Sequence, residues 1–155
     1  LAGGKVPAIW DGAGFAPSLR SAQAGGRDYL VLSQGAWSCQ RSVRFDHYMF
    51  MRSYHDGYHG YPAHMLFDLT HDPHEQHNLA PERPELVGRA LTMLDDWYGL
   101  MMTTATHGQD PMWTVIQEGG PLHTRGHLPA YVERLRATDR SGWADQLAAA
   151  HPKEL

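Results

Sequence analysis

The chain has 155 residues, about the length of a single domain. Hydrophobic residues make up 42% of it and charged residues 19%, which excludes collagen-like, low-complexity and wholly disordered chains. Thirteen basic against seventeen acidic residues give a formal net charge of -4, so we expect no nucleic acid partner. No apolar run approaches the ~20 residues of a membrane-spanning helix, and the single cysteine, Cys39, excludes an internal disulfide.

The first half of the chain predicts a connecting segment followed by a sheet. Glycine and proline are dense through residues 1–28, which disfavours long regular elements there. Four short apolar or alternating stretches follow, separated by turn residues, as expected for an antiparallel meander. The predicted strands are Tyr29–Leu32, Trp37–Arg44, Tyr48–Tyr54 and Met65–Leu69.

The second half predicts helices. From Pro84 to Met101 the apolar residues fall on one arc of a helix, and Pro84 is acceptable in the first turn. Residues 103–127 are predicted to be irregular. A weaker apolar stripe follows from Leu128 to Leu135, and a last short helix is expected with Ser141 as its N-cap and with Trp143 and Leu147 buried.

These elements predict an α+β fold, with a four-stranded antiparallel sheet, one long amphipathic helix packed on a face and a C-terminal helical tail. The predicted organisation is a connecting segment at 1–28, an α+β subdomain at 29–102 and a tail with short helices at 103–155. No internal repeat is present.

Few residues suggest chemistry on their own. Cys39 is expected to lie on an apolar strand face, where a thiol acts as a small hydrophobe. Asp95 and Asp96 fall on the outer side of the predicted helix and are expected to be exposed to solvent. The sequence has no G-x-S-x-G elbow, no P-loop and no H-E-x-x-H motif.

The eleven histidines are the densest candidate ligands. Three lie in one predicted loop, at His55, His59 and His64, and three more lie in the next turn, at His71, His74 and His77. Imidazole is a common zinc ligand, but the spacing supplies no complete ligand set. We therefore expect no metal site, while a stand-alone His-rich metal-binding module is kept as an alternative function.

One segment is more specific than these general features. Residues 65–80 read MLFDLTHDPHEQHNLA, and Pro84 to Val87 open the predicted helix. This resembles the C-terminal signature of the sulfatase family in the alkaline-phosphatase-like superfamily, a strand L-[FY]-D-L followed by D-P-x-E-x-x-N-L and an amphipathic helix. The corresponding signature residues are Asp68, Asp72, Pro73, Glu75, Asn78 and Leu79. Turn chemistry explains them physically, because Asp72 can accept backbone N–H groups and Pro73 presets the backbone.

Two further stretches are similar to the same family. Arg41–Arg44 and Tyr48–Arg52 look like its paired strands, and residues 1–19 look like the stretch that leaves its catalytic domain. The resemblance covers about residues 1–102. Residues 103–155 resemble the tails of only some bacterial members.

The resemblance implies that the catalytic residues lie elsewhere. In sulfatases, a formylglycine made within C/S-x-P-S-R attacks sulfur beside a calcium ion, and both belong to the large N-terminal domain. Residues 39–43 depart from that motif, with Arg41 in place of the proline and Val43 in place of the arginine. Cys39 therefore does not inherit the catalytic role, and no catalytic residue, cofactor or metal is assigned to this chain.

We therefore expect the C-terminal subdomain of a bacterial sulfatase, cut from a longer chain just before Leu1, with a structural role and no activity of its own. Four residues are candidates for the rim of the substrate site: His55, His59, His123 and Arg125. The expected partner is the chain's own N-terminal catalytic domain, and a second copy of the chain is left open. A subdomain of a phosphonate or phosphate ester hydrolase is a further alternative, and the compartment is left open between bacterial cytoplasm and periplasm.

Overall fold

The structure is a computed structural model that describes residues 4, 7, 10, 12, 14–21, 26–105 and 108–155. Much of the predicted connecting segment, including Leu1 and Asp11, lies outside the described residues. Within it, Ala16–Ser21 form a short helix, α1. Among the described residues, no helix combines the length and apolar character needed to cross a membrane.

The predicted meander is confirmed. The strands are β1 (Tyr29–Gln34), β2 (Cys39–Phe45), β3 (Tyr48–His55) and β4 (His64–Asp68), in sheet order β1-β2-β3-β4 with every neighbouring pair antiparallel. Alternation places one apolar row on the covered face, because Val31, Val43, Phe50 and Leu66 lie side by side in register.

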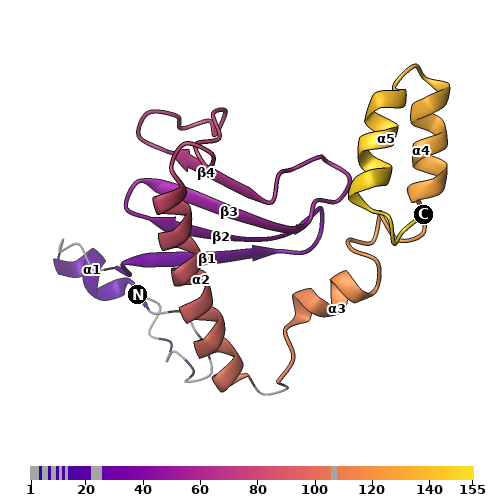
Figure 1. The fold of residues 1–155 in the computed structure, drawn as a ribbon. Helices are drawn as coiled ribbons and strands as arrows, with labels where there is room; N and C mark the ends of the chain where they lie inside the picture. The colour runs from indigo at the N-terminus through magenta and orange to yellow at the C-terminus, as the bar shows by residue number, and fades with distance from the viewer. Residues whose placement is uncertain are drawn as a thin grey trace.

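One long helix covers this row. α2 runs from Pro84 to Thr104 and crosses the strands on one side of the sheet (Figure 1). Its Val87, Ala90 and Leu94 pack against the sheet's apolar row, as the helical arc predicts. Asp95 and Asp96 are exposed, as expected.

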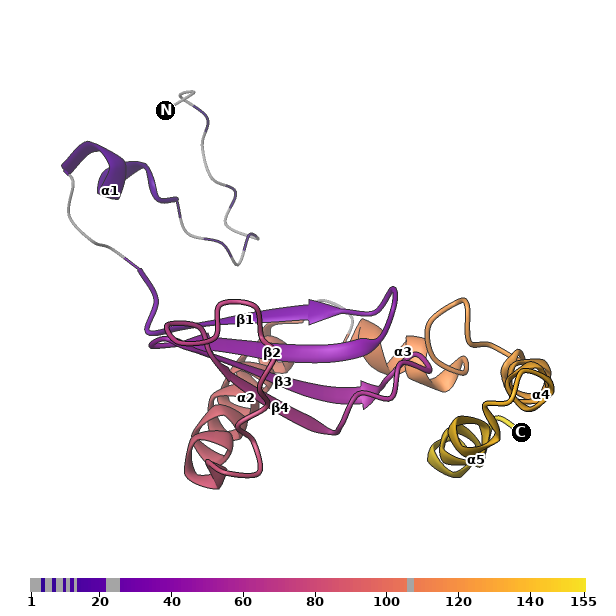
Figure 2. The same cartoon turned by 90° about the horizontal axis from the view of Figure 1, so that it is seen from above.

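The tail is more regular than predicted. α3 (Pro111–Gln117) occupies part of the stretch expected to be irregular, and α4 (Leu128–Ala137) and α5 (Ser141–Ala150) pack side by side beyond the ends of the strands (Figures 1 and 2). The missed signal is the pair Asp110-Pro111, since Asp110 caps α3 by accepting a hydrogen bond from the Met112 N–H at 3.0 Å.

Two expectations for α5 are wrong. Ser141 is the first helical residue, and the N-cap position belongs to Arg140. Trp143 is 41% exposed, because α5 turns Ala144 and Leu147 toward α4 instead. The Trp143 ring lies over Gly60, where a Cβ would come within 2.3 Å of it.

The face of the sheet away from α2 is partly open. Leu30 and Leu32 alternate with the core residues of β1 and are 45% and 44% exposed. In register with Leu32, Ser42 and Met51 are also only partly buried. An apolar strip on an edge strand therefore remains in contact with solvent in the described part of the chain.

Removing a core side chain tests this packing. Leu66 is fully buried beneath α2, so Leu66→Ala should lower the free energy of unfolding by about 2–5 kcal/mol through lost burial and a residual cavity. Leu122, at 78% exposure, is the matched control, and its alanine variant should change stability by less than about 0.5 kcal/mol. Chemical denaturation measures both, and equal losses would contradict this assignment of the core.

Candidate functional site

The loop after β3 contributes to a group of hydrogen-bonded polar side chains. Asp56 shapes it, because its Oδ1 accepts from the Tyr58 N–H at 3.0 Å and its Oδ2 from the Gly60 N–H at 2.8 Å. Gly57 has a φ of +66°, and a Cβ there would lie 1.8 Å from the Trp37 carbonyl oxygen. Only glycine fits this position, which holds the loop tightly against the β1–β2 connection.

His55, a predicted rim residue, is buried and uncharged. Its Nδ1 accepts a hydrogen bond from the Gly57 N–H at 3.0 Å, so the ring proton is on Nε2, which faces Glu154 Oε1 at 3.1 Å. Burial lowers the pKa of His55 below its ordinary value, against the opposing effect of the Glu154 carboxylate.

His151 faces a carboxylate oxygen at both ring nitrogens. Its Nδ1 lies 2.8 Å from Glu154 Oε1 and its Nε2 lies 2.8 Å from Asp56 Oδ1. His151 thereby bridges the Asp56 and Glu154 carboxylates through its two ring nitrogens, while His55 beside it is neutral.

Tyr58 completes the arrangement. Its hydroxyl donates to Glu154 Oε2 at 2.6 Å and lies 3.0 Å from the Thr124 carbonyl oxygen. Burial, followed by the Glu154 carboxylate, raises the pKa of Tyr58 well above its usual range. We call His55, Asp56, Tyr58, His151 and Glu154 the Glu154 cluster.

Metal binding by this cluster conflicts with its hydrogen bonds. Ligand atoms of His55, Asp56 and His151 lie within 4.8 Å of one another, which qualifies them by distance. Neutral imidazole binds a metal through its unprotonated nitrogen, and in His55 that nitrogen already accepts the Gly57 N–H. A metal on Nε2 would displace the proton that faces Glu154. A neutral ring would then carry its proton on Nδ1, and the Gly57 N–H would lose its acceptor.

The other clustered histidines lie apart from the Glu154 cluster. His64 packs against the Phe50 ring at 5.6 Å, His71 pairs with Asp68 at 2.9 Å, and His77 pairs with Glu82 at 3.2 Å. His74 is exposed in the turn. These placements are packing and surface positions.

Two of the remaining rim candidates meet beside the same loop. The His123 Nε2 lies 3.1 Å from the Gly57 carbonyl oxygen, and its ring lies 5.6 Å from Trp37 and 6.1 Å from His59. Arg125 is directed differently, because it binds the Gly120 carbonyl at 3.0 Å and the Glu118 carboxylate at 2.8 Å. The four candidates therefore divide between a buried cluster, an aromatic wall and a surface ion pair.

The signature residues fasten β4 to the approach to α2. Asn78 accepts from the Leu66 N–H at 2.9 Å and the Ala80 N–H at 3.0 Å, and it donates to the His64 carbonyl at 3.2 Å. The Leu79 N–H adds a bond to the Leu66 carbonyl at 2.8 Å. Asn78 thus bonds β4 and the segment leading to α2 in one geometry.

The turn between them is organised by two aspartates. Asp68 accepts from the Thr70 N–H at 2.9 Å, and Asp72 accepts from the His77 N–H at 2.8 Å. Glu75 has a φ of +55° within this turn, which Pro73 opens. Hydrogen bonds lower the pKa of both aspartates, chiefly that from the His71 side chain for Asp68 and the backbone N–H of His77 for Asp72.

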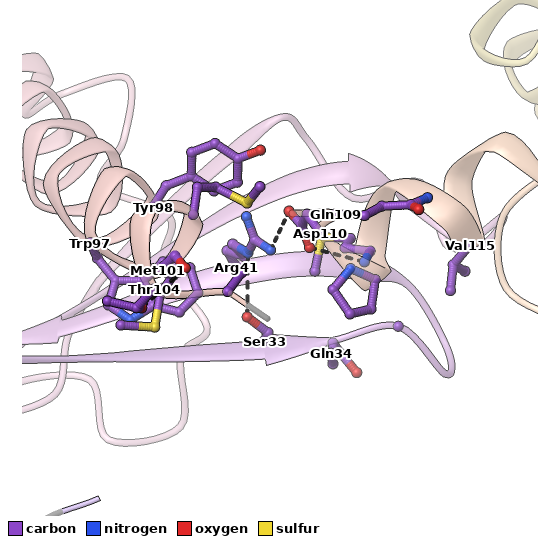
Figure 3. Close-up of a pocket in the computed structure, with 15 residues that line it drawn as sticks. Ser33, Gln34, Arg41, Trp97, Tyr98, Met101, Thr104, Gln109, Asp110 and Val115 are labelled. Atoms are coloured by element: carbon purple, nitrogen blue, oxygen red, sulfur yellow. Dashed lines mark hydrogen bonds and ion pairs between the residues drawn. The ribbon is translucent and has the colours of Figure 1, made fainter. Parts of the chain in front are cut away.

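A pocket lies where α2, α3 and the sheet meet (Figure 3). It has a volume of about 520 Å³, and Arg41 lies at its centre. The guanidinium binds Asp110 at 2.6 Å, and its carbon lies 5.0 Å and 5.4 Å from the Trp97 and Tyr98 ring centroids. Since Asp110 neutralises Arg41, this pocket offers no unpaired charge among the residues that line it.

Cys39 occupies a structural position, as predicted. It is fully buried at the start of β2, and burial raises the pKa of its thiol. A buried, protonated thiol is a poor nucleophile.

The sequence did not predict the two cluster residues that lie near the C-terminus, His151 and Glu154. His151 and Glu154 reach back across 95 to 99 residues to Asp56 and His55. Nothing in their local pattern indicates this contact, because both occur in the short polar stretch after the last helix. The nearest signal was the histidine density in the 55–64 loop.

Comparison with known proteins gives little further information. No protein-family model matches the chain, and no curated protein matches it. One similar solved structure is described as "Metabolism of multiple glycosaminoglycans by bacteroides thetaiotaomicron is orchestrated by a versatile core genetic locus (BT33336S-sulf)"; it is 20% identical, with a TM-score of 0.45. The match covers 59% of this chain and 21% of that one, so this chain spans about a fifth of that protein. At this identity and TM-score, the likeness assigns neither a family nor an activity.

The buried neutral state of His55 predicts a pH effect. Folding lowers the pKa of His55, so the unfolded chain takes up a proton at a pH where the folded chain does not. The free energy of unfolding should therefore fall as the pH drops below about 6.5. His55→Gln should remove this part of the loss, measured as the variant's free energy of unfolding against the parent's at pH 7.5 and 5.5. His74→Gln, in the exposed turn, is the control. A parent and a His55→Gln variant with parallel pH profiles would refute the neutral assignment.

Asn78 predicts a second measurable effect. Asn78→Ala leaves the Leu66 and Ala80 N–H groups without their side-chain acceptor, which should cost about 1–3 kcal/mol. Gln76→Ala, exposed in the same turn, should be nearly neutral. Thermal or chemical unfolding compares them, and equal effects would show that Asn78 does not join the two segments.

Proposed function

We propose that this chain is the C-terminal subdomain of a sulfatase of the alkaline-phosphatase-like superfamily, and that it stabilises the enzyme and shapes its substrate rim without catalytic residues of its own. The observation that carries the proposal is the segment Met65–Leu79. Its residues match the family signature. The side chains of Asn78, Asp68 and Asp72 hydrogen-bond backbone N–H groups and so fix how β4 leads into α2.

The partly open face of the sheet supports the proposal that a covalently attached domain packs on that side. Leu30 and Leu32 lie on β1, the strand that follows the connecting segment. Burial of such side chains is favourable by ~25 cal/mol per Å², so a neighbouring domain that covers them gains stability. The chain's own catalytic domain, entering through residues 1–28, is the partner that this arrangement favours.

The chemistry of the described residues supports the absence of a catalytic role. Cys39 is buried and lacks the motif context, and the carboxylates of the Glu154 cluster are already bound to histidine, tyrosine or backbone donors. We expect the pure chain, supplied with calcium, to give no turnover of an aryl sulfate.

The coding sequence upstream of Leu1 tests the proposal directly. A C/S-x-P-S-R motif within one continuous reading frame, and a natural product whose intact mass matches the long chain, are the expected results. A start codon immediately before Leu1 would overturn the proposal. An upstream superfamily domain that lacks the motif would favour a phosphate or phosphonate ester hydrolase instead.

Leu32→Asp tests the proposed contact. In the long protein the variant should lower aryl sulfatase activity by more than about tenfold, because a buried unpaired carboxylate weakens the domain contact. The 155-residue chain alone should keep its stability, since Leu32 is exposed there. Leu100→Asp, on exposed α2 surface, is the matched control. Full activity of the Leu32→Asp enzyme would place the catalytic domain elsewhere.

A further inference from the structure

A separate pocket opens beside the Glu154 cluster, between the β1–β2 connection, the 57–59 loop and α4. Its volume of about 620 Å³ is within the range of small-molecule sites. Six side chains form most of its wall: Trp37, His59, His123, His127, Tyr131 and Arg134. We call it the Trp37 pocket.

The aromatic side chains form a surface that can accept a ring. Trp37 is 68% exposed although it sits on a tightly fixed loop, and the His123 ring packs beside it at 5.6 Å. Across the pocket, Tyr131 stacks on buried Tyr58 with ring centroids 6.0 Å apart. An exposed indole on a rigid support loses little conformational freedom when a ligand ring packs on it.

The formal charge on the pocket wall is positive and comes from Arg134. No aspartate or glutamate lines it, and it includes one guanidinium and three imidazoles. The Arg134 guanidinium lies over the Tyr131 ring at 5.3 Å, and within the described residues no carboxylate pairs with it. By contrast Arg136, on the same helix, is paired with Asp145 at 2.8 Å.

The pocket is also held in a fixed shape. The carbonyl of Gly57 binds His123 at 3.1 Å, while the Tyr58 hydroxyl binds Glu154 at 2.6 Å. The wall is therefore formed before any ligand arrives. A preformed site avoids much of the ordering cost of binding.

We propose that the Trp37 pocket binds a ring-bearing organic anion, whose ring packs on Trp37 and whose anionic group is held by Arg134. The two requirements follow from the two parts of the wall, an exposed aromatic face and a guanidinium that no carboxylate of the described residues pairs with. The site is complete within this chain, so it goes beyond the proposed function and stands even if no catalytic domain precedes residue 1.

Four probes separate ring recognition from charge recognition. Glucose 6-sulfate and 4-nitrophenyl sulfate carry both features, glucose carries a ring alone, and inorganic sulfate carries the charge alone. Titration of the folded 155-residue chain, followed by NMR of the indole N–H signals and by calorimetry, measures each affinity. At least one sulfated ring should bind saturably below about 10 mM and at least about tenfold more tightly than glucose or sulfate.

Variants locate the site. Trp37→Ala and Arg134→Gln should each weaken binding by about tenfold or more, while Arg136→Gln should leave it unchanged. Both pocket residues are exposed, so circular dichroism should show folded variants. No saturable binding by either sulfated ring, equal binding of glucose or of inorganic sulfate, or binding insensitive to Trp37→Ala and Arg134→Gln would each overturn the proposal.

Discussion

One partly buried carboxylate, that of Glu154, joins the sheet to the C-terminal helices α4 and α5. Glu154 receives hydrogen bonds from His55 at the end of the sheet, from Tyr58 in the following loop and from His151 at the end of α5. A carboxylate removed from water is stable only when its oxygens are satisfied. The position of α4 and α5 relative to the sheet therefore depends on polar geometry as well as on apolar area.

This dependence explains how the core is divided. One apolar cluster lies between the sheet and α2, and a second lies between α4 and α5. Tyr58 belongs to the second cluster but lies in the loop after β3, and its hydroxyl is one of the groups that bond Glu154. The same residue thus contributes apolar contact to the tail and a hydrogen bond to the cluster, so loss of either weakens the junction.

The sequence predicts well wherever structure follows from local periodicity. Short apolar or alternating stretches located all four strands, and the helical arc located α2. Both signals are local, because they depend on residues close together in the sequence. Sequence-based prediction is wrong at α3, although the capping pair Asp110-Pro111 indicates a helix start there. It is also wrong at Trp143, whose exposure depends on how α5 packs over Gly60. The rim candidates were partly brought together, with His59 and His123 beside Trp37, but the grouping needed the loop geometry that Gly57 imposes.

The neutral state of His55 also follows from geometry that no sequence pattern contains. His55 and His151 are chemically identical residues with ring centroids 4.8 Å apart, yet one accepts a backbone N–H and the other faces two carboxylates. Both rings nevertheless contact the same oxygen of Glu154. The Gly57 amide keeps His55 neutral by donating to its Nδ1, and it thereby occupies the nitrogen that a metal would need. Gly57, which also packs closely against Trp37, therefore affects both the protonation of His55 and the shape of the pocket beside the cluster.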